Sequence, residues 1–139
     1  MNEKFMNVAY NEAMKSYKKD EIPVGAVIVK NNVIIAKAHN CKENKKNSIM
    51  HAELLVVDKA CKKLDNWRLD DCVLYTTLEP CMMCMGAIIE SRIKMVYYGT
   101  KSKHKQMYDI YIPNVCFFNM NDVRCSKILS NFFKNKRKK

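Results

Sequence analysis

One histidine, two cysteines and one glutamate have spacings that suit a catalytic zinc site. Cys81 and Cys84 are three residues apart, so one turn of a helix would place both sulfurs on one face. His51 supplies a third ligand, and a catalytic zinc typically keeps three protein ligands and one water. Water bound to zinc has a pKa of about 7. Glu53 is then free to move protons between that water and a substrate.

Pro80 indicates that a helix begins beside the cysteines, because its missing N–H costs nothing at the first helical position. A helix N-terminus stabilises negative charge and so favours the metal-binding thiolates of Cys81 and Cys84. His51 and Glu53 are expected in the first turn of an earlier helix. Together these residues form the H-x-E…P-C-x-x-C pattern typical of zinc-dependent nucleobase deaminases.

Two other interpretations of these residues stay open at this point. The cysteines and the histidine could be unrelated core residues, since the chain has seven cysteines. Alternatively, the zinc could be structural, in a non-catalytic, zinc-stabilised RNA-binding module where Glu53 has no role. A closed site of that kind needs a fourth ligand. The candidates for it are His39, Cys41, Cys61 and Cys72.

Composition predicts one globular domain over residues 1–139. Nearly half of the residues, 48%, are apolar, which is enough for one core. No apolar run approaches the length of a membrane span, and the first residues lack the apolar segment of a signal peptide. The odd number of cysteines fits a reducing, cytoplasmic location. The net charge of +11 favours a polyanionic partner, although a general excess of lysine would produce the same value.

Hydrophobic periodicity predicts helices that alternate with strands. Helices are predicted at 2–18, 51–64, 81–91 and after an N-cap at Asn121 or Asp122, and strands at 24–29, 33–38, 72–77, 94–99 and 115–118. Residues 39–50 and 100–114 are predicted loops. The helix at 81–91 is apolar nearly all round, which predicts a central position. This order of elements predicts an α/β fold, a three-layer α/β/α sandwich with a mixed five-stranded sheet.

The chain resembles the cytidine deaminase-like superfamily and, within it, the bacterial tRNA-specific adenosine deaminases. The resemblance extends over nearly the whole chain, at residues 22–27, 39–40, 51–53, 67–69, 74–84, 86–88, 91–93 and 129–133. The run Thr-Leu-Glu-Pro-Cys-Met-Met-Cys at 77–84, and two phenylalanines before a basic C-terminus, point to the tRNA branch. The cytidine deaminase-like fold is the same three-layer sandwich.

The resemblance implies that wobble adenosine of a tRNA anticodon is deaminated to inosine. It implies one Zn²⁺ per subunit on His51, Cys81 and Cys84, with Glu53 as the proton shuttle. It also implies a homodimer with the active site near the interface. The implied substrate contacts are Asn40 to the flipped nucleoside, Val24, Ala26, Leu78 and Glu79 around the base, and Phe132, Phe133, Lys134 and Lys136 on the anticodon loop.

The chain departs from the family pattern after residue 99. That pattern is Gly-x-x-Asp-x-Lys-x-Gly-Ala, whereas here Ser102 stands at the acidic position, His104 at the lysine position, and the later glycine is missing. The contacts to nucleotides that flank the target base therefore stay open. The alternative function is deamination of a free base or nucleoside such as cytosine, guanine or cytidine, for which a basic tail with two phenylalanines has no obvious use.

Overall fold

The computed structural model describes residues 3–103 and 114–137, and within them a mixed five-stranded sheet. The strands are β1 (Gly25–Lys30), β2 (Val33–His39), β3 (Cys72–Leu78), β4 (Met95–Thr100) and β5 (Cys116–Asn119). Their order across the sheet is β2-β1-β3-β4-β5. β1 is antiparallel to β2 and β3, whereas β3, β4 and β5 are parallel. The predicted sheet is confirmed.

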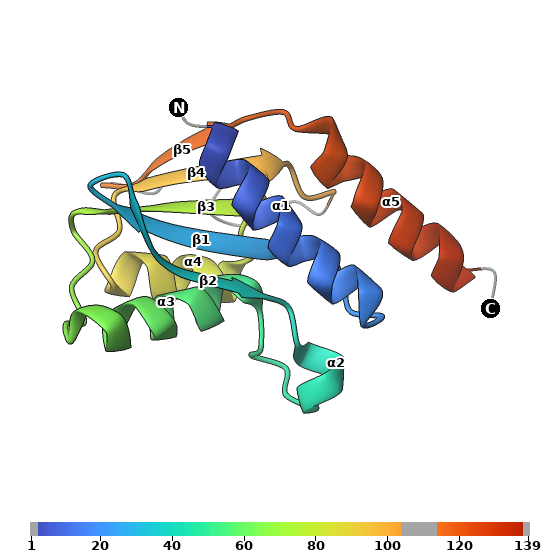
Figure 1. Ribbon diagram of the computed structural model, residues 1–139, viewed down its shortest axis with the longest axis horizontal. Helices are drawn as coiled ribbons and strands as arrows, with labels where there is room; N and C mark the ends of the chain where they lie inside the picture. Colours follow the sequence, from blue (N-terminus) through green and yellow to red (C-terminus); the bar gives the residue numbers. More distant parts are fainter. Residues whose placement is uncertain (1–2, 104–113, 138–139) are drawn as a thin grey trace.

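Helices cover both faces of this sheet (Figure 1). The helices are α1 (Glu3–Lys18), α2 (Lys42–Lys45), α3 (Ala52–Leu64), α4 (Met82–Glu90) and α5 (Val123–Arg137). α1 and α5 lie on one face, and α3 and α4 lie on the other, so the three-layer sandwich is confirmed. The short helix α2 lies in a connection where the sequence predicted only a loop.

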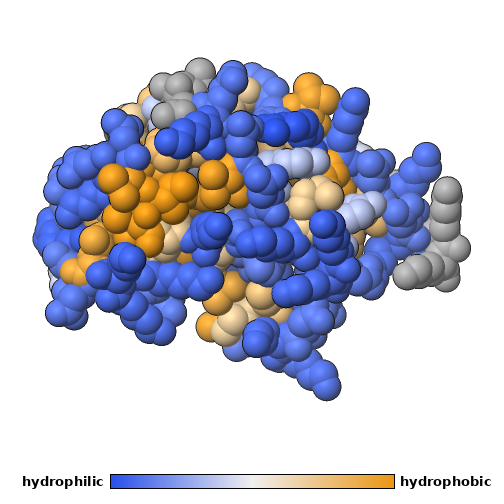
Figure 2. Space-filling view, in the orientation of Figure 1, coloured by the Kyte–Doolittle hydropathy of each residue, from blue (hydrophilic) through white to orange (hydrophobic). Residues whose placement is uncertain are grey.

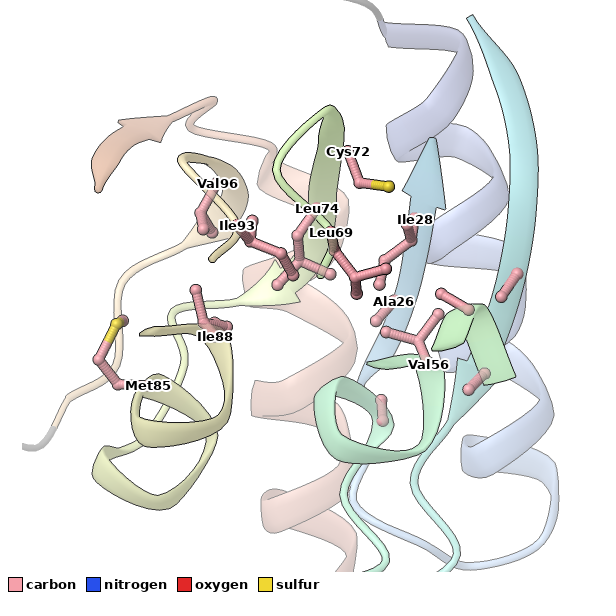
Figure 3. Close-up of a cluster of buried hydrophobic side chains, with 14 of the residues drawn as sticks. Ala26, Ile28, Val56, Leu69, Cys72, Leu74, Met85, Ile88, Ile93 and Val96 are labelled. Atoms are coloured by element: carbon pink, nitrogen blue, oxygen red, sulfur yellow. The ribbon is translucent and has the colours of Figure 1, made fainter. Parts of the chain in front are cut away.

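Alternate residues of the strands build a core on each face, because successive side chains of a strand point to opposite sides. In β1, Ile28 belongs to the core under α3 and α4, where Val56 and Ile88 pack toward the sheet (Figure 3). Val27 belongs to the core under α1, together with Phe5. Burial on both faces explains why β1 is a continuous apolar run from Ala26 to Val29.

Gly25 brings the backbones of α1 and β1 into direct contact. A Cβ atom at this position would lie 2.0 Å from the carbonyl oxygen of Ala9 and 2.5 Å from the nitrogen of Ala13. The sequence left open whether a ligand or neighbouring packing requires this glycine, and the structure assigns the close approach to helix packing.

The prediction that the helix at 81–91, which is α4 in the structure, is central was wrong. Its residues Cys84 and Ile88 are buried, but Met82, Met83 and Ile89 are 52%, 40% and 39% exposed. The reason is that α4 belongs to an outer layer, where only one stripe of a helix can face the sheet. The exposed apolar side chains are referred to below as the α4 patch.

His104 and the rest of the segment 104–113, where most of the departure from the family pattern falls, lie outside the described residues. Among the residues that the structure does describe, no helix is both long and apolar enough to cross a membrane.

Candidate metal centre

The predicted ligands converge where the N-termini of α3 and α4 meet. His51 is the N-cap residue of α3, Cys81 is the N-cap residue of α4, and Cys84 lies in the first turn of α4. The two ligands at the caps therefore stand one position before the helices in which the sequence placed them. Neither His51 nor Cys81 makes a capping hydrogen bond with its side chain, so the imidazole and the thiol are free to face each other.

The distances between these side chains fit one zinc ion. Nδ1 of His51 lies 3.8 Å from Sγ of Cys81 and 3.6 Å from Sγ of Cys84, and the three ligand atoms lie within 4.8 Å of one another. Standard zinc bond lengths in a tetrahedral site separate nitrogen and sulfur ligands by about 3.6 Å. Cys84 is buried, whereas His51 and Cys81 are partly exposed, so the site has an accessible side.

In the described part of the chain, no fourth histidine, cysteine or carboxylate joins this group. The candidates for a fourth ligand have other neighbours. His39 pairs with Glu12, the thiol of Cys41 donates to the carbonyl of His39, and Cys72 belongs to the apolar core. The thiol of Cys61 donates to the carbonyl of Trp67. The three-ligand set is the arrangement of a catalytic zinc, which keeps a position for water.

The surroundings of Cys81 favour its thiolate. Hydrogen bonds from Cys84 and His51 lower the pKa of Cys81 to about 3. The pKa of Cys84 is raised, because its thiol is hydrogen-bonded to Cys81 and is buried. A bound metal would displace the remaining proton, since the thiolate is the form that ligates metal.

Glu53 is buried beside the ligands but is not one of them. It is 4% exposed, and burial raises its pKa to about 7. It interacts with Cys84 and with the charges of Cys81 and His51. A carboxyl group with this pKa can accept and donate a proton at neutral pH, as general acid–base catalysis requires.

Asn40 connects the end of β2 to the metal centre. It is 6% exposed, and its Oδ1 accepts a hydrogen bond of 2.8 Å from the backbone N–H of Ala52, the first residue of α3. Asn40 therefore caps the helix from outside, while its NH₂ group offers two further donors. From spacing alone Asn40 looked like a turn residue. One sequence signal could have indicated this cap. His51 stands at the N-cap of α3 but is not a residue type that usually caps helices, so a side chain from elsewhere is needed to accept the first N–H groups.

The four residues expected around the base differ in accessibility. Val24, Ala26 and Glu79 are buried, whereas Leu78 is partly exposed. The carboxylate of Glu79 accepts a hydrogen bond of 3.1 Å from the N–H of Ser102. Glu79 thus fixes the chain that follows β4.

The C-terminal residues expected to contact RNA lie on α5, across the sheet from α3 and α4. Phe132 is only 7% exposed and packs against Tyr17, whereas Phe133 is 45% exposed. Nζ of Lys136 pairs with Asp20 at 2.6 Å, and Lys134 is exposed. The side chains expected to contact RNA therefore lie on a different helix from the metal ligands, and on the opposite face of the sheet within one chain.

Comparison with known sequences finds deaminases. Residues 1–137 match the MafB19-like deaminase family. A tRNA-specific adenosine deaminase of Buchnera aphidicola subsp. Baizongia pistaciae is 43% identical over 145 aligned positions, covering 96% of this chain and 89% of that protein. The tRNA-specific adenosine deaminase of Bacillus subtilis is 52% identical over 98 residues, which are 70% of this chain. The chain spans 61% of the length of the Bacillus subtilis protein.

A solved structure has the same fold. It comes from work on A-to-I editing by tRNA:A34 deaminases at the wobble position of transfer RNA. It matches with a TM-score of 0.84 and 32% identity, covering 92% of this chain and 100% of that one.

Proposed function

The chain belongs to the MafB19-like deaminase family and is homologous to tRNA-specific adenosine deaminases, and on that premise we propose that it converts wobble adenosine in a tRNA anticodon to inosine. The observation that carries this proposal is a three-ligand group of His51, Cys81 and Cys84 with buried Glu53 beside it. The reaction consumes water and releases ammonia. Because it acts on tRNA, we place the protein in the cytoplasm.

One Zn²⁺ per subunit would be held by His51, Cys81 and Cys84, whose distances fit its tetrahedral geometry. When bound, zinc supplies an activated water as the nucleophile at neutral pH.

Glu53 carries the protons of the reaction. Its carboxylate takes a proton from the attacking water, as the water oxygen bonds to C6 of adenine, and donates that proton to N1. It then takes the remaining hydroxyl proton and gives it to the amino group, which leaves as ammonia. A pKa of about 7 allows the same group to act as base and as acid.

Asn40 and the residues around it would hold the base. The Oδ1 atom of Asn40 is engaged with Ala52, so its NH₂ group is the part that meets the nucleoside. Leu78 would contact the base directly, because it is partly exposed. Buried Val24, Ala26 and Glu79 would support the pocket from behind.

Charge and exposed aromatic surface support RNA as the partner. The net charge is +11, and hydrophilic residues cover most of the face that carries α1 and α5 (Figure 2). Phe133 can stack on a base, whereas buried Phe132 orients the helix. Lys134 and Lys136 would contact phosphate, with Lys136 exchanging its pairing with Asp20.

The α4 patch supports a homodimer. Exposed methionine and isoleucine side chains on the outer surface of α4 are typical of an interface between subunits. Because Cys84 lies on the same helix, pairing through α4 would put the active site next to the partner subunit. We further propose that residues 1–139 act as one domain, since α1 and α5 contact each other on one face of the sheet.

The deciding experiment measures inosine and ammonia from the zinc-loaded protein. The substrates are an anticodon stem-loop with adenosine at the wobble position, the same stem-loop with the adenosine elsewhere in the loop, and free adenosine, cytidine, cytosine and guanine. Turnover confined to the wobble stem-loop is expected. Turnover only on a free base or nucleoside would refute the tRNA substrate and support the small-molecule alternative.

A further inference from the structure

Glu12 is a buried carboxylate that the chemistry above does not use. It lies in α1 and is 4% exposed. Its Oε1 atom lies 3.0 Å from Nδ1 of His39, and its Oε2 atom lies 2.6 Å from Nζ of Lys15. Burial alone would raise the pKa of Glu12, but the hydrogen bonds and charges of Lys15 and His39 outweigh it and lower the pKa. Burying a charged pair contributes little net stability, so the partly buried contact between Glu12 and His39 calls for another role.

His39, the partly buried partner of Glu12, lies at the end of β2, where residues of α1 contact two successive residues of the chain. His39 is the last residue of β2, and Asn40 follows it. Ser16 lies one turn after Glu12 and donates a hydrogen bond of 2.8 Å to the carbonyl oxygen of Asn40. The N–H of Asn40 donates to the carbonyl oxygen of Val24 at 3.1 Å. The backbone at this point is therefore held from several sides.

From Asn40 the contacts reach the metal centre. Oδ1 of Asn40 accepts the N–H of Ala52, which lies between the ligand His51 and the proton carrier Glu53. The side chain of His51 does not cap α3, so this external bond orients the helix N-terminus.

We propose that Glu12 and His39 are a positioning pair that fixes Asn40 and, through Asn40, the N-terminus of α3. The pair touches neither the substrate nor the metal ligands. Its effect on turnover rests on the proposed deaminase function, whereas its effect on α3 does not.

The test replaces Glu12 with an apolar side chain of similar length. Glu12→Met removes the contact with His39, but removing one partner of a buried pair is destabilising. The double variant Glu12→Met/His39→Phe, which replaces both partners with apolar side chains, is therefore measured beside it. Lys15→Met is the matched control, because it removes the other partner of Glu12 and leaves His39 in place. Glu12→Gln is the conservative variant, since an amide oxygen can still accept a hydrogen bond from His39.

The readouts are kcat and KM on the stem-loop, zinc content, melting temperature, and hydrogen exchange of the Ala52 amide. For Glu12→Met we expect kcat to fall at least tenfold, KM to change less than threefold, and exchange at Ala52 to accelerate at least tenfold. Zinc content should stay at the wild-type value, and the melting temperature of the double variant should lie closer to wild type than that of Glu12→Met. For Lys15→Met and Glu12→Gln, we expect kcat, KM and the exchange rate at Ala52 to stay within threefold of wild type.

Wild-type kcat and exchange in Glu12→Met would overturn the proposal, and so would an equal loss in Lys15→Met. If Glu12→Met does not fold, His39→Phe breaks the same contact from the other side and must show the same changes. The exchange measurement needs no substrate. A wild-type protein without activity on RNA would therefore refute the proposed function and leave the positioning pair to be judged by exchange alone.

Discussion

The proposed mechanism gives Glu53 and the three ligands separable roles, because Glu53 would move protons without holding metal. Replacing it with the isosteric, non-ionisable glutamine should leave zinc binding and fold intact. Since general acid–base catalysis typically contributes 10²–10⁴-fold, we expect Glu53→Gln to lower kcat by at least about 10²-fold. Stem-loop turnover, zinc content and circular dichroism check this. Wild-type turnover would remove Glu53 from the mechanism.

Cys84 should be necessary for metal, unlike a cysteine buried elsewhere. Removing one of three ligands is expected to reduce the zinc content of Cys84→Ala to well below one ion per chain, because the remaining two hold it weakly. Cys125→Ala is the control, since Cys125 is equally buried but lies in the core under α1. Zinc is measured by mass spectrometry after dialysis. Full occupancy in Cys84→Ala would reject this ligand.

At the scale of elements, the carboxylate of Glu21 anchors helix α2. Glu21 is 1% exposed and accepts hydrogen bonds of 2.9 Å and 2.6 Å from the N–H groups of Glu43 and Asn44. Burial alone would raise the pKa of Glu21, but these hydrogen bonds outweigh it and place the pKa below the usual 4.5. The stabilisation is therefore present above pH 4.5 and is lost as pH falls through the folded-state pKa.

Glu21→Gln should thus lower the free energy of unfolding at pH 7 by about 1–2 kcal/mol, because charged hydrogen bonds are replaced by neutral ones. The difference in the free energy of unfolding between Glu21→Gln and wild type should become smaller as pH falls below 4.5. Urea denaturation from pH 7 to about pH 2 measures this difference in the free energy of unfolding. Glu43→Gln is the control, as its exposed side chain changes while its N–H stays. A difference that does not vary with pH would contradict the charge-based anchor.

The contact of α1 with β1 makes Gly25 irreplaceable by even the smallest side chain. Gly25→Ala places a Cβ against the backbone of α1, which should cost about 3 kcal/mol or more, since backbone atoms cannot rotate away. Gly86→Ala is the matched control, because a Cβ there meets nothing within 4 Å and alanine favours a helix by roughly 1 kcal/mol. Thermal denaturation of both variants tests this. Equal stability of Gly25→Ala and wild type would show that the helix shifts freely.

At the scale of the whole molecule, the α4 patch should decide the oligomeric state. Ile89→Lys introduces charge on an exposed position, so we expect the chain to keep its fold but to dissociate to monomers. Val33→Lys is the control, because Val33 is 60% exposed in the β1–β2 hairpin, on other elements. Analytical ultracentrifugation distinguishes the two states. A dimeric Ile89→Lys variant, or a monomeric wild type, would contradict an interface through α4.

Residue spacing and apolar periodicity alone predicted the candidate metal ligands, the glutamate beside them and the three layers of this protein. His51 and Glu53, and likewise Cys81 and Cys84, lie so close in the chain that the start of one helix brings each pair together. Apolar periodicity depends on the local repeat of helix or strand, so the elements and the sandwich were predictable.

Tertiary structure alone decided how these elements face one another. Which stripe of a helix is covered depends on its neighbours, so only the fold shows that α4 exposes Met82 and that α5 buries Phe132 but exposes Phe133. The bond from Asn40 to Ala52 and the pair of Glu12 with His39 join residues 12 and 27 positions apart. Such contacts arise from the packing of whole elements, which no local pattern of residues encodes.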